Sequence, residues 1–489
     1  MDVDGDGDLD FVLSGDPDRG SHVQWVENKG GDAFEARVLD DSVEGLPDAS
    51  KRGRRAATLA ADFNNDGRVD IYMSACINFL GEAHPTNCSY GIFYENLGAG
   101  RYRAVQDHGL DPPLMEFAAA AGDVNGDGLL DLFVSEGLPF GNNIELVGVY
   151  KSKLYINKGD FKFEDSGLNV DNPSTCISTF VDYDNDGDLD IVTGSCFLLN
   201  LTLSSAGPPA VQNIPGPVKL LKNMHKEFEA MFGAPRLQFE DVTDLVFGPL
   251  DRGLWFGVSM ADLNGDGRVD FYFGNTGDKR LNQAHLLLLS QPGGTYRNET
   301  VGSGVGFHEF NWGSDFMDLN NDGNVDLVTV GALSDNPNWL PIRNPGSTFM
   351  NMGGGGFEML GDLGLRDHFC SGLATADYNE DGSQDAMVLC STATTPISTG
   401  VFTGRGRLFL FKGTAAMDRH VGFALSGVAS NSQGIGANVR LCAVDAAGGG
   451  QAPGRCQLRV VTAGCSYAST HSPVAHFGVP EGASVLQVG

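Results

Sequence analysis

The sequence has no long apolar run, no excess of basic residues and none of the common catalytic motifs. No apolar stretch reaches the roughly 18 residues of a membrane-spanning helix, and no signal peptide follows Met1. Lys and Arg number 32 against 63 Asp and Glu, a formal charge of −31. A Gly-x-Ser-x-Gly elbow, a Walker loop and a His-Glu-x-x-His motif are missing. We therefore expect no membrane span in this chain, no nucleic-acid partner and no catalytic residues.

The acidity is concentrated in one repeated pattern, Asp-x-(Asp/Asn)-x-Asp-Gly-x-x-Asp. Seven copies, called loops one to seven below, begin at Asp2, Asp62, Asp123, Asp182, Asp262, Asp318 and Asp377. Positions 1, 3, 5 and 9 of these loops hold 23 of the 63 acidic residues. The rest of the chain is therefore only moderately acidic. A repeat of about 60 residues points to a repeat architecture.

Alternating oxygen-bearing side chains in a tight loop are typical of calcium sites, because Ca²⁺ takes six to eight oxygen ligands. Gly at position 6 permits the sharp turn, and position 7 can offer its backbone carbonyl, so its side chain is free to vary. An EF-hand would need Glu at position 12, which no copy has. The alternative is an Asp/Gly turn without metal, and seven copies in register disfavour it. The expected cofactor is Ca²⁺, up to seven ions.

The predicted calcium ligands are positions 1, 3, 5, 7 and 9 of every loop. They are Asp2, Asp4, Asp6, Asp8 and Asp10; Asp62, Asn64, Asp66, Arg68 and Asp70; Asp123, Asn125, Asp127, Leu129 and Asp131; Asp182, Asp184, Asp186, Asp188 and Asp190; Asp262, Asn264, Asp266, Arg268 and Asp270; Asp318, Asn320, Asp322, Asn324 and Asp326; and Asp377, Asn379, Asp381, Ser383 and Asp385.

Each repeat reads as strand, loop, strand, variable segment, strand, Gly turn, strand. In the third repeat these strands are Phe117–Ala121, Leu130–Val134, Lys153–Asn157 and Phe161–Glu164. Four short strands per unit predict a propeller blade, with small residues on the inner strand next to the axis. We expect an all-β chain: a seven-bladed β-propeller over 1–412 whose first blade lacks its inner strand, then a small β-rich domain over 413–489. We read Met1, which directly precedes loop one, as a truncated or wrongly assigned start, and the C-terminal domain as truncated.

The nine cysteines contain no Cys-x-x-Cys pair. Two pairs, Cys176/Cys196 and Cys370/Cys390, flank loops four and seven with 20 residues between partners, so strands entering and leaving the loop would place them at bridging distance. Cys76/Cys88 and Cys442/Cys456 are the other predicted disulfides, and Cys465 is left over. Buried free thiols are the alternative. Disulfides would indicate an oxidising, extracytosolic compartment.

These repeats resemble the FG-GAP, or VCBS, calcium repeats of integrin α-chain propellers. The C-terminal motifs resemble the ASPIC/UnbV domain: they are His420-Val-Gly-Phe-Ala-Leu-Ser-Gly427, Gly434-Ile-Gly-Ala-Asn-Val-Arg440, Gly464-Cys-Ser-Tyr467 and His476-Phe-Gly478. Together they are similar to the cartilage acidic protein family and its bacterial and algal relatives. The resemblance covers nearly the whole chain and implies a secreted or cell-surface calcium-binding protein without established catalysis. An EGF-like module, present in some relatives, is missing.

Two function classes stay open: a calcium-stabilised interaction or adhesion scaffold, and a calcium propeller that binds or cleaves polysaccharide. The loops should share one face of the ring, so the long variable segments should emerge on the opposite face, with an extracellular protein or acidic polysaccharide as partner. The predicted ligand face consists of residues at the starts of the inner strands. They are Arg54, Arg55, Phe117, Trp255, Trp312 and Phe369. The alternative is that the aromatic residues pack in the channel and the basic run is a solvated loop.

Overall fold

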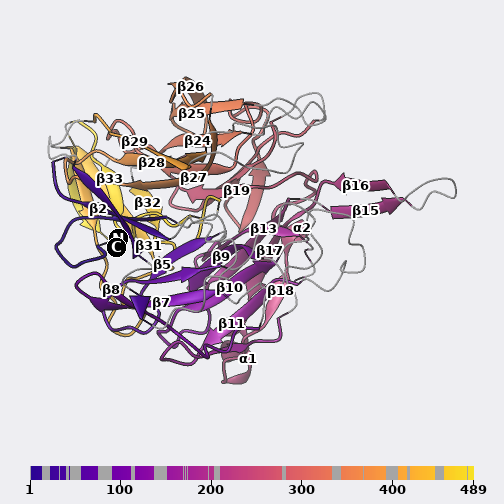
Figure 1. Cartoon of the computed structure of the whole chain (residues 1–489). Helices are drawn as coiled ribbons and strands as arrows, with labels where there is room; N and C mark the ends of the chain where they lie inside the picture. The colour runs from indigo at the N-terminus through magenta and orange to yellow at the C-terminus, as the bar shows by residue number, and fades with distance from the viewer. Residues whose placement is uncertain are drawn as a thin grey trace.

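The computed structural model describes 2–13, 23–31, 33–39, 43–44, 57–74, 91–111, 116–136, 151–168, 170, 172, 174–196, 198–202, 210–277, 282–332, 343–366, 368–391, 406–415, 419–445, 456–467, 469–481 and 483–488. The fold is the predicted seven-bladed β-propeller followed by a C-terminal β domain. In Figure 1 the blades run from indigo through magenta to orange, and the C-terminal strands are yellow.

Blades two to six each contain four antiparallel strands that follow one another along the chain. The strands are, blade by blade, β5 (Thr58–Ala61), β6 (Asp70–Met73), β7 (Ile92–Gly98) and β8 (Arg101–Ala104); β9 (Glu116–Gly122), β10 (Asp131–Glu136), β11 (Lys153–Asn157) and β12 (Phe163–Asp165); β13 (Thr175–Val181), β14 (Asp190–Ser195), β17 (Val218–Asn223) and β18 (Phe239–Asp241); β19 (Gly257–Ala261), β20 (Asp270–Gly274), β21 (Leu286–Gln291) and β22 (Thr295–Asn298); and β23 (Gly313–Met317), β24 (Asp326–Ala332), β25 (Arg343–Asn351) and β26 (Phe357–Asp362).

The first and seventh blades have three strands among the residues described. Blade one contains β1 (Phe11–Leu13), β2 (Gln24–Asn28) and β3 (Phe34–Val38), and blade seven contains β27 (Phe369–Ala376), β28 (Asp385–Ser391) and β29 (Gly406–Phe411). Strand β1 follows its loop, so the described part of blade one contains no strand before the loop. A short strand, β4 (Val43–Glu44), pairs in parallel with β8 at the outer edge of blade two.

Small side chains let the inner strands approach the axis. In β9 the run Ala118–Ala121 is buried, and β9 lies against the next inner strand, β13. Large apolar residues fill the spaces between neighbouring blades. Phe133 of the second strand β10 and Phe180 of the inner strand β13 share such a cluster. Small residues toward the axis and large residues between the blades therefore build the ring.

Blade four contains structure that the sequence pattern does not predict. Helix α1 (His225–Phe232) starts directly after β17, and the short helix α2 (Thr243–Val246) follows β18. Strands β15 (Leu198–Thr202) and β16 (Ala210–Ile214) form a hairpin that projects from the body in Figure 1. These additions leave loop four between β13 and β14, as in every other complete blade.

The C-terminal domain is formed by β30 (His420–Phe423), β31 (Asn438–Asp445), β32 (Cys456–Val460), β33 (Ala475–Gly478) and β34 (Ala483–Val488). Strand β30 pairs with β33, and β31 lies between β32 and β34. Its apolar residues, including Val439, Leu441 and Phe477, share one buried cluster with Leu59 and Leu132 of blades two and three. The domain is therefore packed onto the propeller.

Candidate metal centres

The Asp at position 9 links every loop to its own blade. It is almost fully buried, and one carboxylate oxygen accepts the backbone N–H of position 2 at 2.8–3.2 Å. The other oxygen accepts a backbone N–H at or near the end of the third strand, at 2.7–2.8 Å. In loop three these donors are Val124 and Asn157, and the acceptor is Asp131. Position 9 thus holds the loop in place through two backbone hydrogen bonds.

An Asn at the end of the third strand joins neighbouring blades. Asn157 donates from its side chain to Leu130 O of its own loop at 3.0 Å and to Phe63 O of the preceding loop at 2.9 Å. Asn223 and Asn351 make the same pair of bonds. Asn28 of blade one donates to Tyr378 O of blade seven at 3.0 Å, which closes the ring.

Hydrogen bonds from the backbone of each loop fix the carboxylates at positions 1 and 5. The position-1 carboxylate accepts the N–H of Gly at position 6, and the position-5 carboxylate accepts the N–H of position 7; in loop two these bonds are Gly67 to Asp62 at 2.8 Å and Arg68 to Asp66 at 2.9 Å. The position-6 Gly has a positive φ in all seven loops, from 79° to 101°. The predicted glycine turn is therefore present in each loop.

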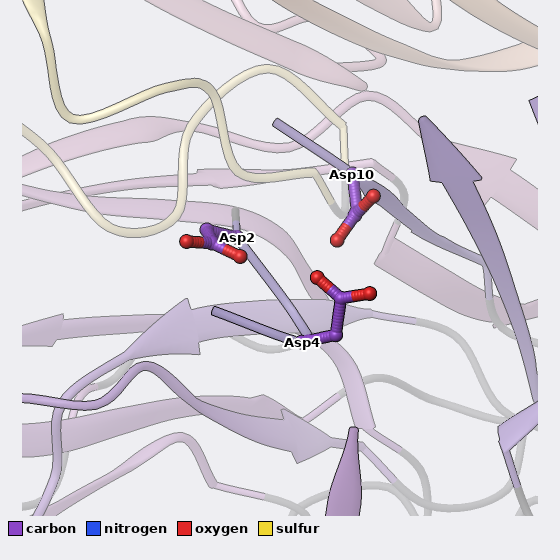
Figure 2. A group of neighbouring side chains, drawn as sticks. All are labelled: Asp2, Asp4 and Asp10. Carbon is purple, nitrogen blue, oxygen red and sulfur yellow. The ribbon is translucent and has the colours of Figure 1, made fainter. Parts of the chain in front are cut away.

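Loops one and four bring three carboxylates together. One oxygen from each of Asp2, Asp4 and Asp10 lies within 4.8 Å of the others, and Asp182, Asp184 and Asp190 form the equivalent group. Figure 2 shows the Asp4 and Asp10 carboxylates turned toward each other, with Asp2 beside them.

In loops two, three, six and seven, position 3 is Asn, and its amide donates to the position-5 carboxylate at 3.0–3.2 Å. In these loops the Asn side chain is therefore hydrogen-bonded to the position-5 carboxylate of its own loop.

Burial changes the protonation of these carboxyl groups. Desolvation raises the pKa of Asp70 and Asp131 to about 8 and that of Asp270 and Asp326 to about 7, even though backbone N–H donors lower it. Burial raises the pKa of Asp182 to about 6, with repulsion from Asp186 as a further cause. A cation bound among these groups would favour their ionised forms.

Basic side chains lie beside several loops, which the sequence pattern does not reveal. The Lys222 ammonium contacts Asp184, lies 3.0 Å from Asp186 and lies 2.9 Å from Glu227 of α1. Asp184 Oδ1 is nevertheless buried without a hydrogen-bond partner among the described residues. Loop four thus offers an unsatisfied carboxylate oxygen, but a calcium ion there would share its ligands with an internal ammonium.

The C-terminal domain covers the loop face of the ring. Gln433 Oε1 accepts the N–H of Asp62 in loop two at 2.7 Å, and Asn438 donates to Asn185 Oδ1 in loop four at 3.2 Å. Arg440 donates to Gly267 O in loop five at 2.8 Å. Further contacts are made by Ala429 with loop three and by His476 with Asn321 of loop six.

One segment of this domain, 461–467 together with 469–475, enters the channel and is called the channel hairpin below. Ala463 forms a β-bridge with Ala121 of β9, and Ser466 forms one with Val258 of β19. Gly464 passes so close to β9 that an added Cβ would lie 2.4 Å from Ala119 O. The described inner strands therefore surround a peptide from the chain's own C-terminal domain.

The residues predicted for the ligand face do not form one group in the structure. Phe117 and Trp312 are buried beside the half-buried Phe369 in a cluster that also contains Tyr467 of the channel hairpin; the Trp312 and Tyr467 ring centroids are 4.5 Å apart. Trp255 is buried in a separate cluster and donates to Gly216 O at 2.9 Å. The 54–55 arginine pair lies outside the described residues. These positions favour channel packing for the aromatic residues.

The predicted disulfides Cys176–Cys196, Cys370–Cys390 and Cys442–Cys456 are formed. The predicted Cys76–Cys88 pair lies outside the described residues, and Cys465 is a buried free thiol. Neither described helix has the length and apolar character needed to cross a membrane.

Comparison with known proteins agrees with this architecture. The FG-GAP-like repeat model matches residues 2–73, and the ASPIC and UnbV model matches residues 427–489. No curated protein sequence matches the chain.

Two solved structures resemble this chain, with TM-scores of 0.40 and 0.38. An Agrocybe aegerita lectin that recognises non-reducing terminal N-acetylglucosamine has 15% identity and a TM-score of 0.40, over 84% of this chain and 96% of that chain. RAG in complex with one melted and one unmelted RSS has 10% identity and a TM-score of 0.38, over 76% of this chain and 98% of that chain. The chain therefore carries an FG-GAP-like repeat and an ASPIC/UnbV domain on a seven-bladed β-propeller.

Proposed function

We propose that the protein is an extracellular, calcium-binding interaction scaffold that binds its ligand on the propeller face opposite the calcium loops. The observation that supports this most directly is the position of the C-terminal domain. Its contacts with loops two to six occupy the loop face, and its channel hairpin fills the axis. The opposite face is then the one on which an external ligand has room.

The chemistry of the loops supports the calcium part of the proposal. Each loop presents carboxylate or amide oxygens at alternating positions on a backbone already held in a turn, and hard cations prefer such oxygen sets. Such preorganisation lowers the cost of ordering the site when the ion binds. Calcium would be a structural component here, because loops two to seven each join two strands of one blade.

The disulfides support the extracytosolic part, since such bonds persist in oxidising compartments. As partner we propose an acidic polysaccharide or an acidic extracellular protein. The basis is Lys51-Arg52-Gly53-Arg54-Arg55, a dense basic run in an acidic chain, which directly precedes β5. A basic site of this kind attracts sulfated or uronic groups.

The ligand test is binding of heparin at physiological salt in the presence of calcium. The Arg54→Ala/Arg55→Ala variant should bind at least about tenfold more weakly, the equivalent of roughly 1.4 kcal/mol. Arg101→Ala is the matched control: Arg101 is exposed, belongs to the same blade and lies at the turn between β7 and β8 on the loop face. An equal loss of heparin affinity in both variants, or no heparin binding by the parent, would contradict the proposed ligand face. The calcium scaffold is tested separately, by melting with and without chelator.

The polysaccharide-cleaving alternative makes a different prediction. A lyase or hydrolase would shorten the glycan during incubation, whereas a scaffold would leave its length unchanged. Size analysis of heparin or alginate after incubation with the calcium-loaded protein distinguishes the two.

A further inference from the structure

In blades four and six, the residue before the third-strand Asn lies beside the ligand positions of its loop. In blade six this residue is Met350, whose sulfur accepts the side-chain N–H of Asn320, position 3 of loop six, at 3.5 Å. In blade four it is Lys222, whose ammonium contacts Asp184 at position 3 and lies 3.0 Å from Asp186 at position 5. The same place beside a loop thus holds an uncharged side chain in one blade and a positive charge in the other.

A third carboxylate holds the Lys222 ammonium in this place. Glu227 of α1 lies 2.9 Å from it, and the Lys222 side chain is only 17% exposed. Three carboxylates around one partly buried ammonium form an ion-pair network, which is held more firmly than a single exposed pair. The side chain therefore has little freedom to turn away from loop four.

Helix α1 occupies further ligand atoms of the same loop. Lys226 Nζ donates to Asp186 O at 2.8 Å, and the Lys226 backbone N–H donates to the Asp188 carboxylate at 2.7 Å. Lys226 Nζ lies so close to the turn of the loop that a Cβ added to Gly187 would be 2.3 Å from it. Both described helices belong to blade four, so among the described parts of the chain only loop four is covered in this way.

These contacts oppose calcium binding in loop four, although three of its carboxylates converge. A calcium ion held by Asp184 and Asp186 would lie close to the Lys222 ammonium, and like charges repel strongly where water is partly excluded. Asp184 Oδ1 has no hydrogen-bond partner among the described residues, but Ca²⁺ needs six to eight oxygen ligands. The ligand set of loop four therefore does not fit a calcium ion while Lys222 is in place.

The basic residues beside loops two, five and seven are more exposed than Lys222. Arg68 and Arg268 contact the position-5 carboxylates of their own loops, and Lys412 lies 3.2 Å from Asp381. These three side chains are 31–46% exposed. Exposed ion pairs contribute little to stability, because water solvates the charges when the pair separates. Calcium can therefore displace these side chains at a low cost.

We propose that Lys222 takes the place of calcium in loop four, so that this loop stays empty of calcium at concentrations that fill the other loops. The ammonium neutralises the loop carboxylates, and α1 covers them. Blade four would then keep the shape of its loop in the presence of a chelator. This inference rests on the proposed function, since it requires that other loops bind calcium.

The test counts the calcium ions bound per chain by equilibrium dialysis at about 1 mM calcium. Lys222→Met gives blade four the residue that blade six has, and it should bind about one ion more than the parent. Its melting temperature should also rise more than that of the parent when calcium is added. The control Lys219→Met removes a lysine near the start of the same strand, which lies 3.0 Å from Asp241, and should bind as many ions as the parent.

Substitutions at position 1 assign the ions to individual loops. In the double variant Lys222→Met/Asp182→Asn the additional ion should be lost again. In the parent background, Asp182→Asn should leave the number of bound ions unchanged, whereas the matched substitution Asp123→Asn in loop three should remove about one ion.

The outcomes separate this inference from the proposed function. If the parent binds calcium but Lys222→Met binds no additional ion, the inference is wrong and the calcium scaffold stands. An equal loss of calcium in Asp182→Asn and Asp123→Asn would contradict the inference in the same way, and this comparison decides the matter even if Lys222→Met does not fold. If neither the parent nor Lys222→Met binds calcium, the inference and the calcium scaffold are both wrong.

Discussion

At the scale of single residues, the most informative feature is the Asn that ends the third strand. Its side chain joins the loops of two adjacent blades, and both carbonyls that it binds are inside the protein. Removing it leaves two buried acceptors without donors, and such groups cost about 1–3 kcal/mol each.

Asn157→Ala should therefore destabilise the protein by roughly 2–6 kcal/mol in chemical denaturation. The control is Asn298→Ala: Asn298 ends an outer strand, is exposed and makes only a local bond to the Thr300 N–H. The Asn298→Ala substitution should lower the free energy of unfolding by less than about 1 kcal/mol. Equal losses would mean that the contacts between blades contribute little.

The buried carboxyl groups at position 9 predict a pH dependence. The folded-state pKa of Asp70 and Asp131 is about 8 and that of Asp270 and Asp326 about 7, all above the ordinary value of 3.8. The metal-free folded protein therefore binds more protons than the unfolded chain, and its stability falls as pH rises toward these values. His471, with a raised pKa of about 9, acts in the same direction.

Between pH 6.5 and 8.5 the melting temperature of the chelated protein should fall, and saturating calcium should reduce this slope because the bound ion displaces the protons. The buried His108, whose pKa burial lowers from 6.5 to about 4, opposes this fall only at the lower end of the window, where the unfolded imidazole still loses its proton. A melting temperature of the chelated protein that rises across the window would contradict the account.

At the scale of elements, the repeat pattern predicts the blades well. The predicted strand at 153–157 coincides with β11, and those at 117–121 and 130–134 overlap β9 and β10. The alternation of acidic loop and apolar strand is local, so it can be read from sequence. Helix α1 and the hairpin of β15 and β16 lie in a variable segment without such periodicity, so they could not be placed.

The docking of the C-terminal domain could not be predicted either, because it joins surfaces far apart in sequence. Its glycines are the only local sign: Gly478 packs so closely on loop six that an added Cβ would lie 2.1 Å from Asp318 Oδ2. The third-strand Asn is a signal that was visible in the sequence, since it recurs at 28, 96, 157, 223 and 351. Its role between blades needed the structure.

Gly478→Ala should lift β33 from loop six and destabilise the protein by about 1–3 kcal/mol. Hydrogen exchange should become faster across 456–478. Gly422→Ala is the matched control in the paired strand β30, because its Cβ would meet only the Val474 side chain at 3.3 Å. Equal stability and equal hydrogen exchange in the two variants would contradict the close packing of Gly478 on loop six.

At the scale of the whole molecule, the chain is a ring that is stabilised in three ways. Asn28 joins blade one to blade seven, the C-terminal domain spans loops two to six, and the channel hairpin fills the axis. Each of these contacts is made with a loop or with the inner strand that leads into a loop. Ordered loops are therefore a condition for the assembled ring.

Calcium should accordingly contribute to global stability. Extracellular modules bind calcium with Kd values of ~10⁻⁴–10⁻³ M. At ~1 mM calcium, a Kd of ~10⁻⁴ M gives about 1.4 kcal/mol per site, or roughly 10 kcal/mol if all seven loops bind. A gain of this size is comparable with the whole stability of a typical domain.

The most direct measurement is thermal melting at pH 7.5 in 1 mM calcium and in excess chelator, with equal magnesium as the ionic control. The account predicts that chelation lowers the melting temperature by about 10 °C and that returning calcium, but not magnesium, restores it. The same melting temperature with calcium and with chelator would contradict structural calcium in these loops.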